Sequence, residues 1–352
     1  MPNWLSTMQQ TFEYYVVDPA TWKNVRQLNN VKSCTISRDL DADSLGSATI
    51  DMDDSVGECY IRAYLVTIQN GVKEKHPLGT YLIQTPATNH DGRKRGFSMD
   101  AYTPLIELKE KPPSLGYSIF KNENIMDFAY RLVRENARAP VVQAKCDELL
   151  QSDFVSNTED NWLTFINDLV AVAKYRLDLD ELGRILFAVE QKTEALQPVW
   201  TFNDDNSSIL YPDMTMDHDL YGIPNVVEIL YANGAGHYYS RVVNDDPNSP
   251  TSIVSRGREI VHRELDPNIG GNPGQGHIQE YAERRLKELS SIEYKISFTH
   301  GYCPVRLGDC VRLNYSRAGF NNIKAKIISQ SIKCEPGCPV TTKAVFTKKL
   351  WG

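Results

Sequence analysis

Four cysteines in the last fifth of this 352-residue chain have a spacing that could bind a metal, because thiolates are ligands for zinc. Zinc knuckles usually place two ligands about two to four residues apart. Cys334 and Cys338 fall at the edge of that range, whereas Cys303 and Cys310 lie outside it. Cys310 also opens the alternating run CVRLNY, which is typical of a strand. We therefore expect buried free thiols instead of a zinc site.

An acidic segment begins like a calcium loop, with Asp39, Asp41 and Asp43 at alternate positions. The sixth position is Ser44 and the twelfth is Ile50, where a calcium loop needs glycine and a bidentate glutamate. The pattern therefore predicts an acidic turn between strands. The segment NDDPNSP is also interpreted as a turn, because Asp and Asn favour turns for backbone reasons.

Other catalytic and ligand-binding patterns are incomplete. The glycine-rich stretch GGNPGQG lacks the preceding strand and the following Lys-Ser/Thr pair of a phosphate loop, so it predicts a connector. No Gly-x-Ser-x-Gly elbow occurs, and carboxylate pairs among 45 acidic residues are unspecific. The seven histidines occur singly, at His76, His90, His218, His237, His262, His277 and His300. We expect no catalytic, cofactor-binding or metal-binding residue, no cofactor, and no enzyme activity.

The composition is that of an ordinary globular protein, with 41% hydrophobic and 24% charged residues, and the length suggests two or three domains. A net charge of −7 argues against a general nucleic-acid binder, which needs a basic face. The start of the chain shows no signal peptide pattern, and no apolar run is long enough for a membrane helix. We expect a chain that folds in the cytoplasm without membrane insertion. Its seven cysteines are then free thiols.

Residues 11–105 read as strands and turns, with Asn70-Gly71 at a tight hairpin because both residues tolerate positive φ. Two prolines then end the pattern, and a mixed α/β segment follows at 110–190. Asn124 can cap its first helix, and a second helix is expected to begin near Thr158. The sequence around Glu181-Leu182-Gly183 predicts another hairpin.

Strands return from about residue 195, with a hairpin at Asn233-Gly234 and a later helix after the glycine-rich connector. One face of that helix carries the apolar residues Ile278, Tyr281, Ala282, Leu286 and Leu289. The two β-regions are loosely similar. YIRAYLVTIQNG followed by GTYLIQTP parallels CVRLNYSRAGFNN followed by KAKIISQSI.

These patterns predict an α+β, mainly β chain with two similar antiparallel β-domains, each a small barrel or sandwich, a mixed α/β insert and a small helix-containing insertion. A family resemblance, given below, implies that both domains are β-barrels of the tube type. The first barrel is expected at 1–108 and the mixed insert at 109–192. The second barrel is expected at 193–243 and 291–352, interrupted by a loop-plus-helix insertion at 244–290.

Several short segments resemble the baseplate hub proteins of tailed phages, relatives of the late control protein. Their order spans much of the C-terminal half, and the N-terminal layout also suits the family. The matching segments are Asp246-Pro247-Asn248-Ser249-Pro250, Gly257-Arg258, Tyr302-Cys303-Pro304, Gly308-Asp309 and Gln330-Ser331-Ile332.

Within the second of these segments, Arg258 either pairs across an interface at a turn or is a solvated residue at a strand end.

The resemblance implies a homotrimer in which two similar barrels per chain form a pseudo-sixfold ring. Such a ring joins a hexameric tail tube to a trimeric spike or fibre. The implied partners are tail tube or distal tail proteins, the tape measure protein and the central spike or fibre, with viral DNA passing through without specific binding. The implied location is the virion baseplate, assembled in the host cytoplasm. The alternatives are a tail-associated cell-wall hydrolase and a carbohydrate-binding tail-tip protein.

Overall fold

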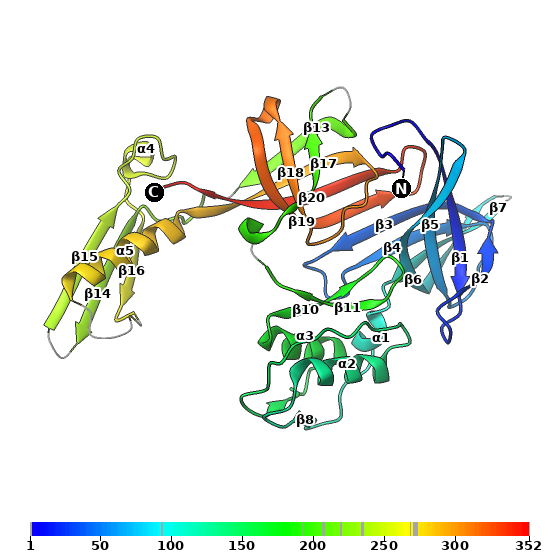
Figure 1. The fold of residues 1–352 in the computed structure, drawn as a ribbon, viewed down its shortest axis with the longest axis horizontal. Coiled ribbons are helices and arrows are strands. Elements are labelled where there is room, and N and C mark those ends of the chain that lie inside the picture. The colour runs from blue at the N-terminus through cyan, green and yellow to red at the C-terminus, as the bar shows by residue number, and fades with distance from the viewer. Residues whose placement is uncertain are drawn as a thin grey trace. The chain divides into compact units, whose positions relative to one another are not determined.

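The computed structural model describes residues 2–92, 94–191, 193–205, 208–218, 220–233, 236–267, 269 and 274–351. They form two compact units, one of residues 1–214 with 297–344 and one of residues 215–296 with 345–352. Strands predominate and helices are few (Figure 1). This confirms the predicted α+β, mainly β fold class.

The first β-region has six strands that follow one another in the sheet, and β2 extends it at one edge. At the β5–β6 hairpin Gln69 pairs with Val72, and Asn70 and Gly71 have φ of 52° and 78°, as predicted. The sheet order is β3-β4-β7-β6-β5-β1-β2. The strands are β1 (Gln9–Val17), β2 (Asn24–Leu28), β3 (Val31–Asp39), β4 (Gly46–Met52), β5 (Tyr60–Gln69), β6 (Val72–Asp91) and β7 (Lys94–Tyr102).

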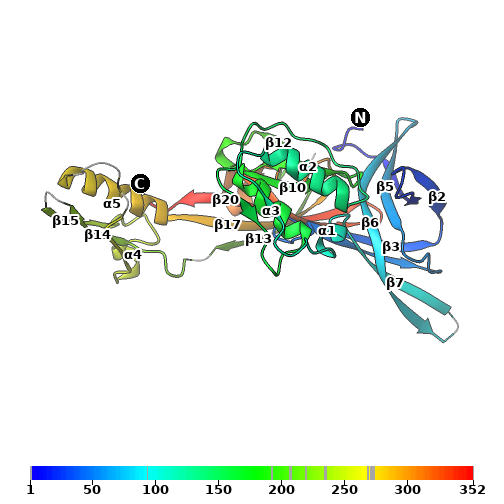
Figure 2. The same ribbon diagram turned by 90° about the horizontal axis from the view of Figure 1, so that it is seen from below.

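The β6–β7 hairpin continues past the start of β5. Tyr60 of β5 pairs with Leu82, whereas the β6–β7 ladder runs on to Asp91 opposite Lys94. Figure 2 shows this hairpin extending away from β5. In the described chain, the β5 side of β6 beyond Leu82 is therefore left without a partner strand.

The second β-region has the same strand order as the first. Its sheet runs β12-β18-β19-β20-β17-β13, and the first region runs β1-β5-β6-β7-β4-β3. Taken in chain order, the strands of the two regions correspond one to one, and each pair occupies the same place in its sheet. The pairs are β1 and β12, β3 and β13, β4 and β17, β5 and β18, β6 and β19, and β7 and β20. The strands are β12 (Pro198–Asn203), β13 (Leu210–His218), β17 (Ser291–Gly301), β18 (Cys310–Tyr315), β19 (Phe320–Lys333) and β20 (Pro339–Lys349), with short 3₁₀ turns η1 (Thr193–Ala195) and η2 (Ser316–Ala318).

The two regions differ in detail. β1 is antiparallel to β5, whereas β12 is parallel to β18. The β3–β4 connection is a short turn, whereas a whole α/β segment separates β13 from β17. The strand order is thus repeated while the connections are not.

One strand pair joins the two β-regions into a single sheet. The first part of β19 pairs with β18, and its last part, Ser329–Lys333, pairs antiparallel with β3. Ile332 lies opposite Ile36, and both are buried. We call this β3–β19 ladder the seam.

The mixed insert has its own core, which lies between its helices and the β10–β11 hairpin (Figure 1). Asn124 caps α2 as predicted, because its side chain accepts a hydrogen bond from Asp127 N at 2.9 Å. The next helix, predicted to begin near Thr158, begins at Trp162, because Asn161 caps it and accepts from Thr164 N. The elements are α1 (Ile106–Lys109), β8 (Ser118–Ile119), α2 (Ile125–Asn136), β9 (Phe154–Val155), α3 (Trp162–Val172), β10 (Tyr175–Leu179) and β11 (Ile185–Val189).

The second unit is a three-stranded sheet of order β15-β14-β16 with α5 packed on one face. Ile278, Ala282 and Leu286 of α5 are buried, and Tyr281 and Leu289 pack beside them, so the predicted helix face is confirmed. The elements are β14 (Val226–Asn233), β15 (Gly236–Val243), α4 (Ile253–Arg256), β16 (Val261–Leu265) and α5 (Gln275–Leu289). No helix in the described residues is long and apolar enough to span a membrane.

The β14–β15 hairpin lies in this unit, whereas the sequence-based division places 193–243 in the second barrel. The reason is that β14 pairs with β16 and that both hairpin strands pack against α5. Within the predicted turn, Gly234 lies outside the described residues, as do residues 270–273 of the glycine-rich connector. Gly257 ends α4 with φ of 62°, which agrees with the turn, and Arg258 is exposed.

A buried histidine lies in the core of the second β-region. His300 is fully buried beside Phe202 and Phe298. Its Nδ1 lies 2.7 Å from the Gly301 carbonyl, which can only accept, and its Nε2 lies 2.8 Å from the Thr342 hydroxyl. Both ring nitrogens are satisfied in the neutral imidazole. Burial lowers the pKa of His300 to about 4.

We expect this histidine to make the fold sensitive to acid. The unfolded chain protonates His300 below its ordinary pKa of 6.5, whereas the folded chain resists protonation until about pH 4. Stability should therefore decrease by about 3 kcal/mol as the pH falls across this window. Thermal unfolding between pH 4 and 7 measures the effect. His300→Gln should flatten the slope, and an unchanged slope would contradict this assignment.

Candidate functional site

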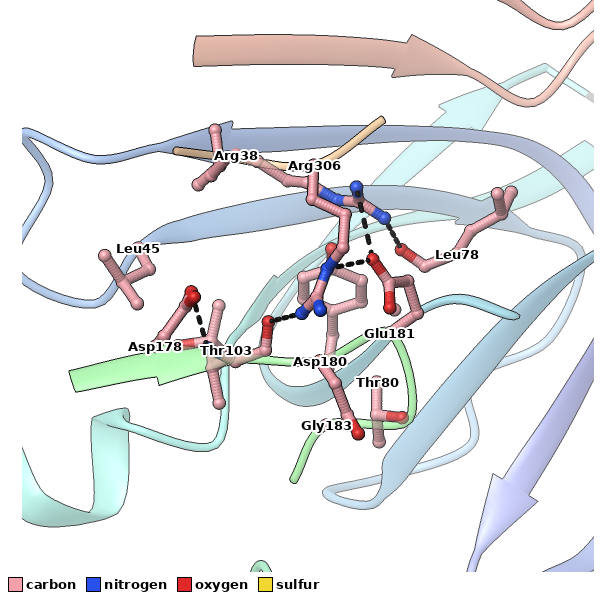
Figure 3. A pocket seen from close by; sticks show the side chains of 14 residues that line it. Arg38, Leu45, Leu78, Thr80, Thr103, Asp178, Asp180, Glu181, Gly183 and Arg306 are labelled. Carbon is pink, nitrogen blue, oxygen red and sulfur yellow. Dashed lines mark hydrogen bonds and ion pairs between the residues drawn. The ribbon is translucent and has the colours of Figure 1, made fainter. Parts of the chain in front are cut away.

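The turn between β10 and β11 contacts both β-regions, and this junction is the candidate functional site (Figure 3). The predicted hairpin at Glu181-Leu182-Gly183 is confirmed, because Leu179 pairs with Ile185. The Leu182 carbonyl accepts hydrogen bonds from Trp22 Nε1 at 2.8 Å and from Arg62 Nη2 at 2.9 Å. These bonds hold the insert against the first β-region.

Arg62 is buried, with 4% of its surface exposed, yet its guanidinium is well supplied with acceptors. Its Nε donates to the Thr80 hydroxyl at 2.8 Å and its Nη1 to Asn24 Oδ1 at 3.1 Å. A buried guanidinium is stable only when its donors are paired. The Leu182 carbonyl is one of these acceptors, so the turn also completes the environment of Arg62.

Glu181 connects the turn to the second β-region. Its Oε1 lies 2.8 Å from Arg306 Nε and 4.0 Å from Arg38 Nη1. Arg306 Nη2 also donates to the Leu179 carbonyl at 2.8 Å. Figure 3 shows Arg38 and Arg306 both directed at this carboxylate. One acidic group thus serves two cations from different β-regions.

Arg38 lies on β3 beside the seam. Its Nη2 donates to the Leu78 carbonyl at 2.5 Å and its Nη1 to Gln330 Oε1 at 3.2 Å. Gln330, on β19, donates in turn to the Val305 carbonyl at 3.3 Å. Burial alone would lower the pKa of Arg38, but Tyr81 and the Glu181 carboxylate raise it above its ordinary value. The guanidinium therefore stays charged inside the junction.

The acidic groups near the turn are committed to structural bonds. Asp180 accepts from the backbone N–H groups of Leu182 and Arg184 and pairs with the Arg184 side chain at 2.5 Å. Asp309 accepts from Arg306 N at 2.8 Å, and burial raises its pKa. Asp180 and Glu181 each form an ion pair with an arginine, and these ion pairs can hold three segments together.

The four cysteines considered as zinc ligands do not gather at one place, because Cys334 and Cys338 belong to the first core whereas Cys303 and Cys310 lie in the second β-region. Cys310 is buried in β18, and Cys303 lies 3.9 Å from His300 Nδ1. Cys338 is buried in the first core, whereas Cys334 is half-buried next to Cys34. Burial raises the pKa of Cys303 and of Cys338, which favours the protonated thiols.

The acidic segment after β3 forms a turn. Asp39 Oδ1 accepts from Asp41 N at 2.9 Å, and Asp43 pairs with Lys109 at 2.8 Å. Throughout the described residues, no three His, Cys, Asp or Glu side chains form a group that could hold a metal.

Sequence reasoning missed the junction itself, because Arg38, Arg62, Glu181 and Arg306 follow no motif. A signal was nevertheless present in two of the segments that resemble hub proteins. Gly308-Asp309 holds the Arg306 backbone, and Gln330-Ser331-Ile332 is the part of β19 that forms the seam. These segments are positioned to build the junction.

Known structures have a fold similar to that of this chain, whereas sequence comparisons find no match. No family model matches the chain, and no curated protein matches its sequence. A tail protein from Neisseria meningitidis MC58 has a similar structure, with a TM-score of 0.61 at 12% identity, over 97% of this chain and 98% of that one. The 43 kDa tail protein of prophage MuSo2 from Shewanella oneidensis gives 0.59 at 11% identity, over 96% and 98%.

A Francisella PdpA-VgrG complex also contains a similar chain, with a TM-score of 0.54 at 10% identity. The match covers 99% of this chain and 54% of that one. The chain thus shares its fold with these two tail proteins and with a chain of this complex. At these identities the similarity concerns the fold alone.

We expect Glu181 to stabilise the junction through its charge. Glu181→Gln removes the carboxylate and leaves Arg38 and Arg306 without their shared counter-ion, which should cost about 1–3 kcal/mol. Glu190→Gln is the matched control, because Glu190 is exposed and ends the same hairpin. Chemical denaturation of both variants gives the comparison. Equal stability of the two variants would contradict the bridging role.

We also expect the turn to depend on the glycine at position 183. Gly183 has φ of 74°, and an added Cβ would lie 2.6 Å from Thr80 Cβ. Gly71→Ala is the control, since Gly71 has φ of 78° with open space around it. Gly71→Ala should cost about 1 kcal/mol from backbone strain, and Gly183→Ala at least twice as much. Similar losses, measured by denaturation, would show that the turn is not held against Thr80.

Proposed function

We propose that this protein is a structural hub of a phage tail or tail-like baseplate, acting as a trimeric ring that adapts a sixfold tail tube to a threefold spike or fibre. The observation that carries the proposal is the repeated strand order of the two β-regions. A hexameric tube needs six similar surfaces to meet it, whereas a trimeric spike needs three. A trimer whose chains each contain two equivalent β-regions, called blocks from here on, presents six similar surfaces to the tube and three to the spike.

The seam supports a specific mode of assembly. Inside one chain, edge strand β3 of the first block pairs with the last part of β19. The counterpart of β3 is β13, and the counterpart of β19 is β6. In the described chain β13 has one neighbour, β17, and residues 85–89 of β6 have a free side. We infer that β13 of one subunit pairs with this part of β6 in the next, which would repeat the seam around the ring.

The proposed partners are tail tube or distal tail proteins, the tape measure protein and a central spike or fibre. Viral DNA would pass through the ring without specific binding, because a net charge of −7 opposes contact with phosphates. The location would be the virion baseplate after assembly in the host cytoplasm. The role is structural and not enzymatic, which the commitment of the junction acids to ion pairs supports.

Size-exclusion chromatography with light scattering tests the trimer. We expect a mass three times that of the chain, for the protein alone or after mixing with tube and spike proteins. Electron micrographs should then show a threefold ring with a central hole. A monomer that persists with those partners present would overturn the proposal.

A variant of the free edge tests the mode of pairing. Gly301 donates to the Ile209 carbonyl, so regular alternation turns the backbone groups of Pro212 and Met214 to the edge away from β17, where the Pro212 carbonyl already accepts from the Tyr315 hydroxyl. Met214→Pro removes an edge donor and should weaken the trimer at least tenfold, with the monomer still folded. Met214→Thr keeps the N–H group and should retain the trimer. If both variants form trimers equally well, the inferred pairing is wrong.

A further inference from the structure

Two cysteines from opposite ends of the chain face each other at one end of the seam. The ladder pairs Ile332 with Ile36 and Lys333 with Thr35, which makes Cys334 the next residue opposite Cys34. Cys334 N donates to the Cys34 carbonyl at 2.9 Å, so the pairing continues to this position. Hydrogen-bonded opposite residues have Cα atoms about 5.5 Å apart, within the range of about 4.4–6.8 Å found for disulfides.

Their side chains are also close neighbours. Cys34 is 3% exposed in the first core, and Cys334 is half-buried against it. The interaction with Cys334 and burial raise the pKa of Cys34 well above its ordinary value, and burial together with both thiols raises the pKa of Tyr14. Both cysteines are free thiols in this structure. The half-buried Cys334 is the one that a small oxidant can reach.

We propose that Cys34 and Cys334 form a redox site, in which oxidation closes a disulfide across the seam. A disulfide oxidant such as oxidised glutathione supplies the reaction. The Cys334 thiolate attacks it, forms a mixed disulfide and releases one glutathione. The Cys34 thiolate then attacks the Cys334 sulfur, and the second glutathione leaves. Two protein thiols lose two protons and two electrons, and one oxidised glutathione becomes two reduced ones.

This disulfide would cross-link the two β-regions covalently at their joining strands. The loop that it closes contains residues 35–333, which include most of both β-regions and the mixed insert. A long closed loop restricts the unfolded chain strongly and so stabilises the folded one. The inference goes beyond the proposed function and does not rest on it, because it needs only the single chain.

Peptide mapping of the folded full-length chain tests the site. The reduced protein is incubated with oxidised glutathione, alkylated and digested with trypsin. We expect a cross-linked pair of peptides, residues 33–38 joined to 334–343. The oxidised chain should migrate faster on a non-reducing gel and unfold about 5 °C higher. Addition of a reductant should reverse all three results.

Variants identify the two sulfurs, since peptide 334–343 also contains Cys338. Cys338→Ser should keep the cross-link, whereas Cys334→Ser should abolish the cross-link and the rise in melting temperature. Cys34→Ser should stop at the mixed disulfide with glutathione on Cys334. No cross-link in the folded native chain, or one that joins Cys334 to Cys338, would overturn the proposal. A cross-link that forms only after unfolding would overturn it as well.

Discussion

The structure depends on the backbone ladder between β3 and β19, which lie almost a full chain length apart in sequence. The Arg38–Gln330 bond alone spans 292 positions. Without the ladder, two strand edges would lose their partners and Arg38 would lose an acceptor. Closing so long a loop costs chain entropy, so the pairing needs support from buried side chains such as Ile36 and Ile332. The seam is therefore where the fold concentrates its long-range interactions.

The mixed insert adds a second connection between the two β-regions, beside the seam. Its turn offers backbone carbonyls to Arg62 and Arg306, and Glu181 lies between Arg306 and Arg38. Close approach is possible because glycine occupies the contact points. At Gly308 an added Cβ would lie 2.9 Å from an Arg176 nitrogen. Within this unit the insert is thus held against the two β-regions by charge pairs and tight backbone contacts, and Trp22 and Leu45 of the first β-region also pack against its apolar core.

The features that sequence predicted are local ones. The Asn70-Gly71 turn, the Asn124 cap and the apolar face of α5 each follow from residues within a few positions of one another. The features that it missed need distant partners. The β14–β15 hairpin belongs with β16 and α5, and nothing in its alternation shows that choice. The junction of Arg38, Arg62 and Arg306 could not be predicted for the same reason, because single arginines far apart in sequence form a site only after folding.

The differences between the two blocks are as informative as their shared strand order. In the proposed trimer, each feature common to both blocks occurs six times, and each feature of one block occurs three times. The mixed insert follows only the first block, and the α5 segment interrupts only the second, in place of the short β3–β4 turn. Elements that must meet a threefold spike are therefore best sought in these insertions, whereas contacts with a sixfold tube are best sought on the repeated strands and their common turns.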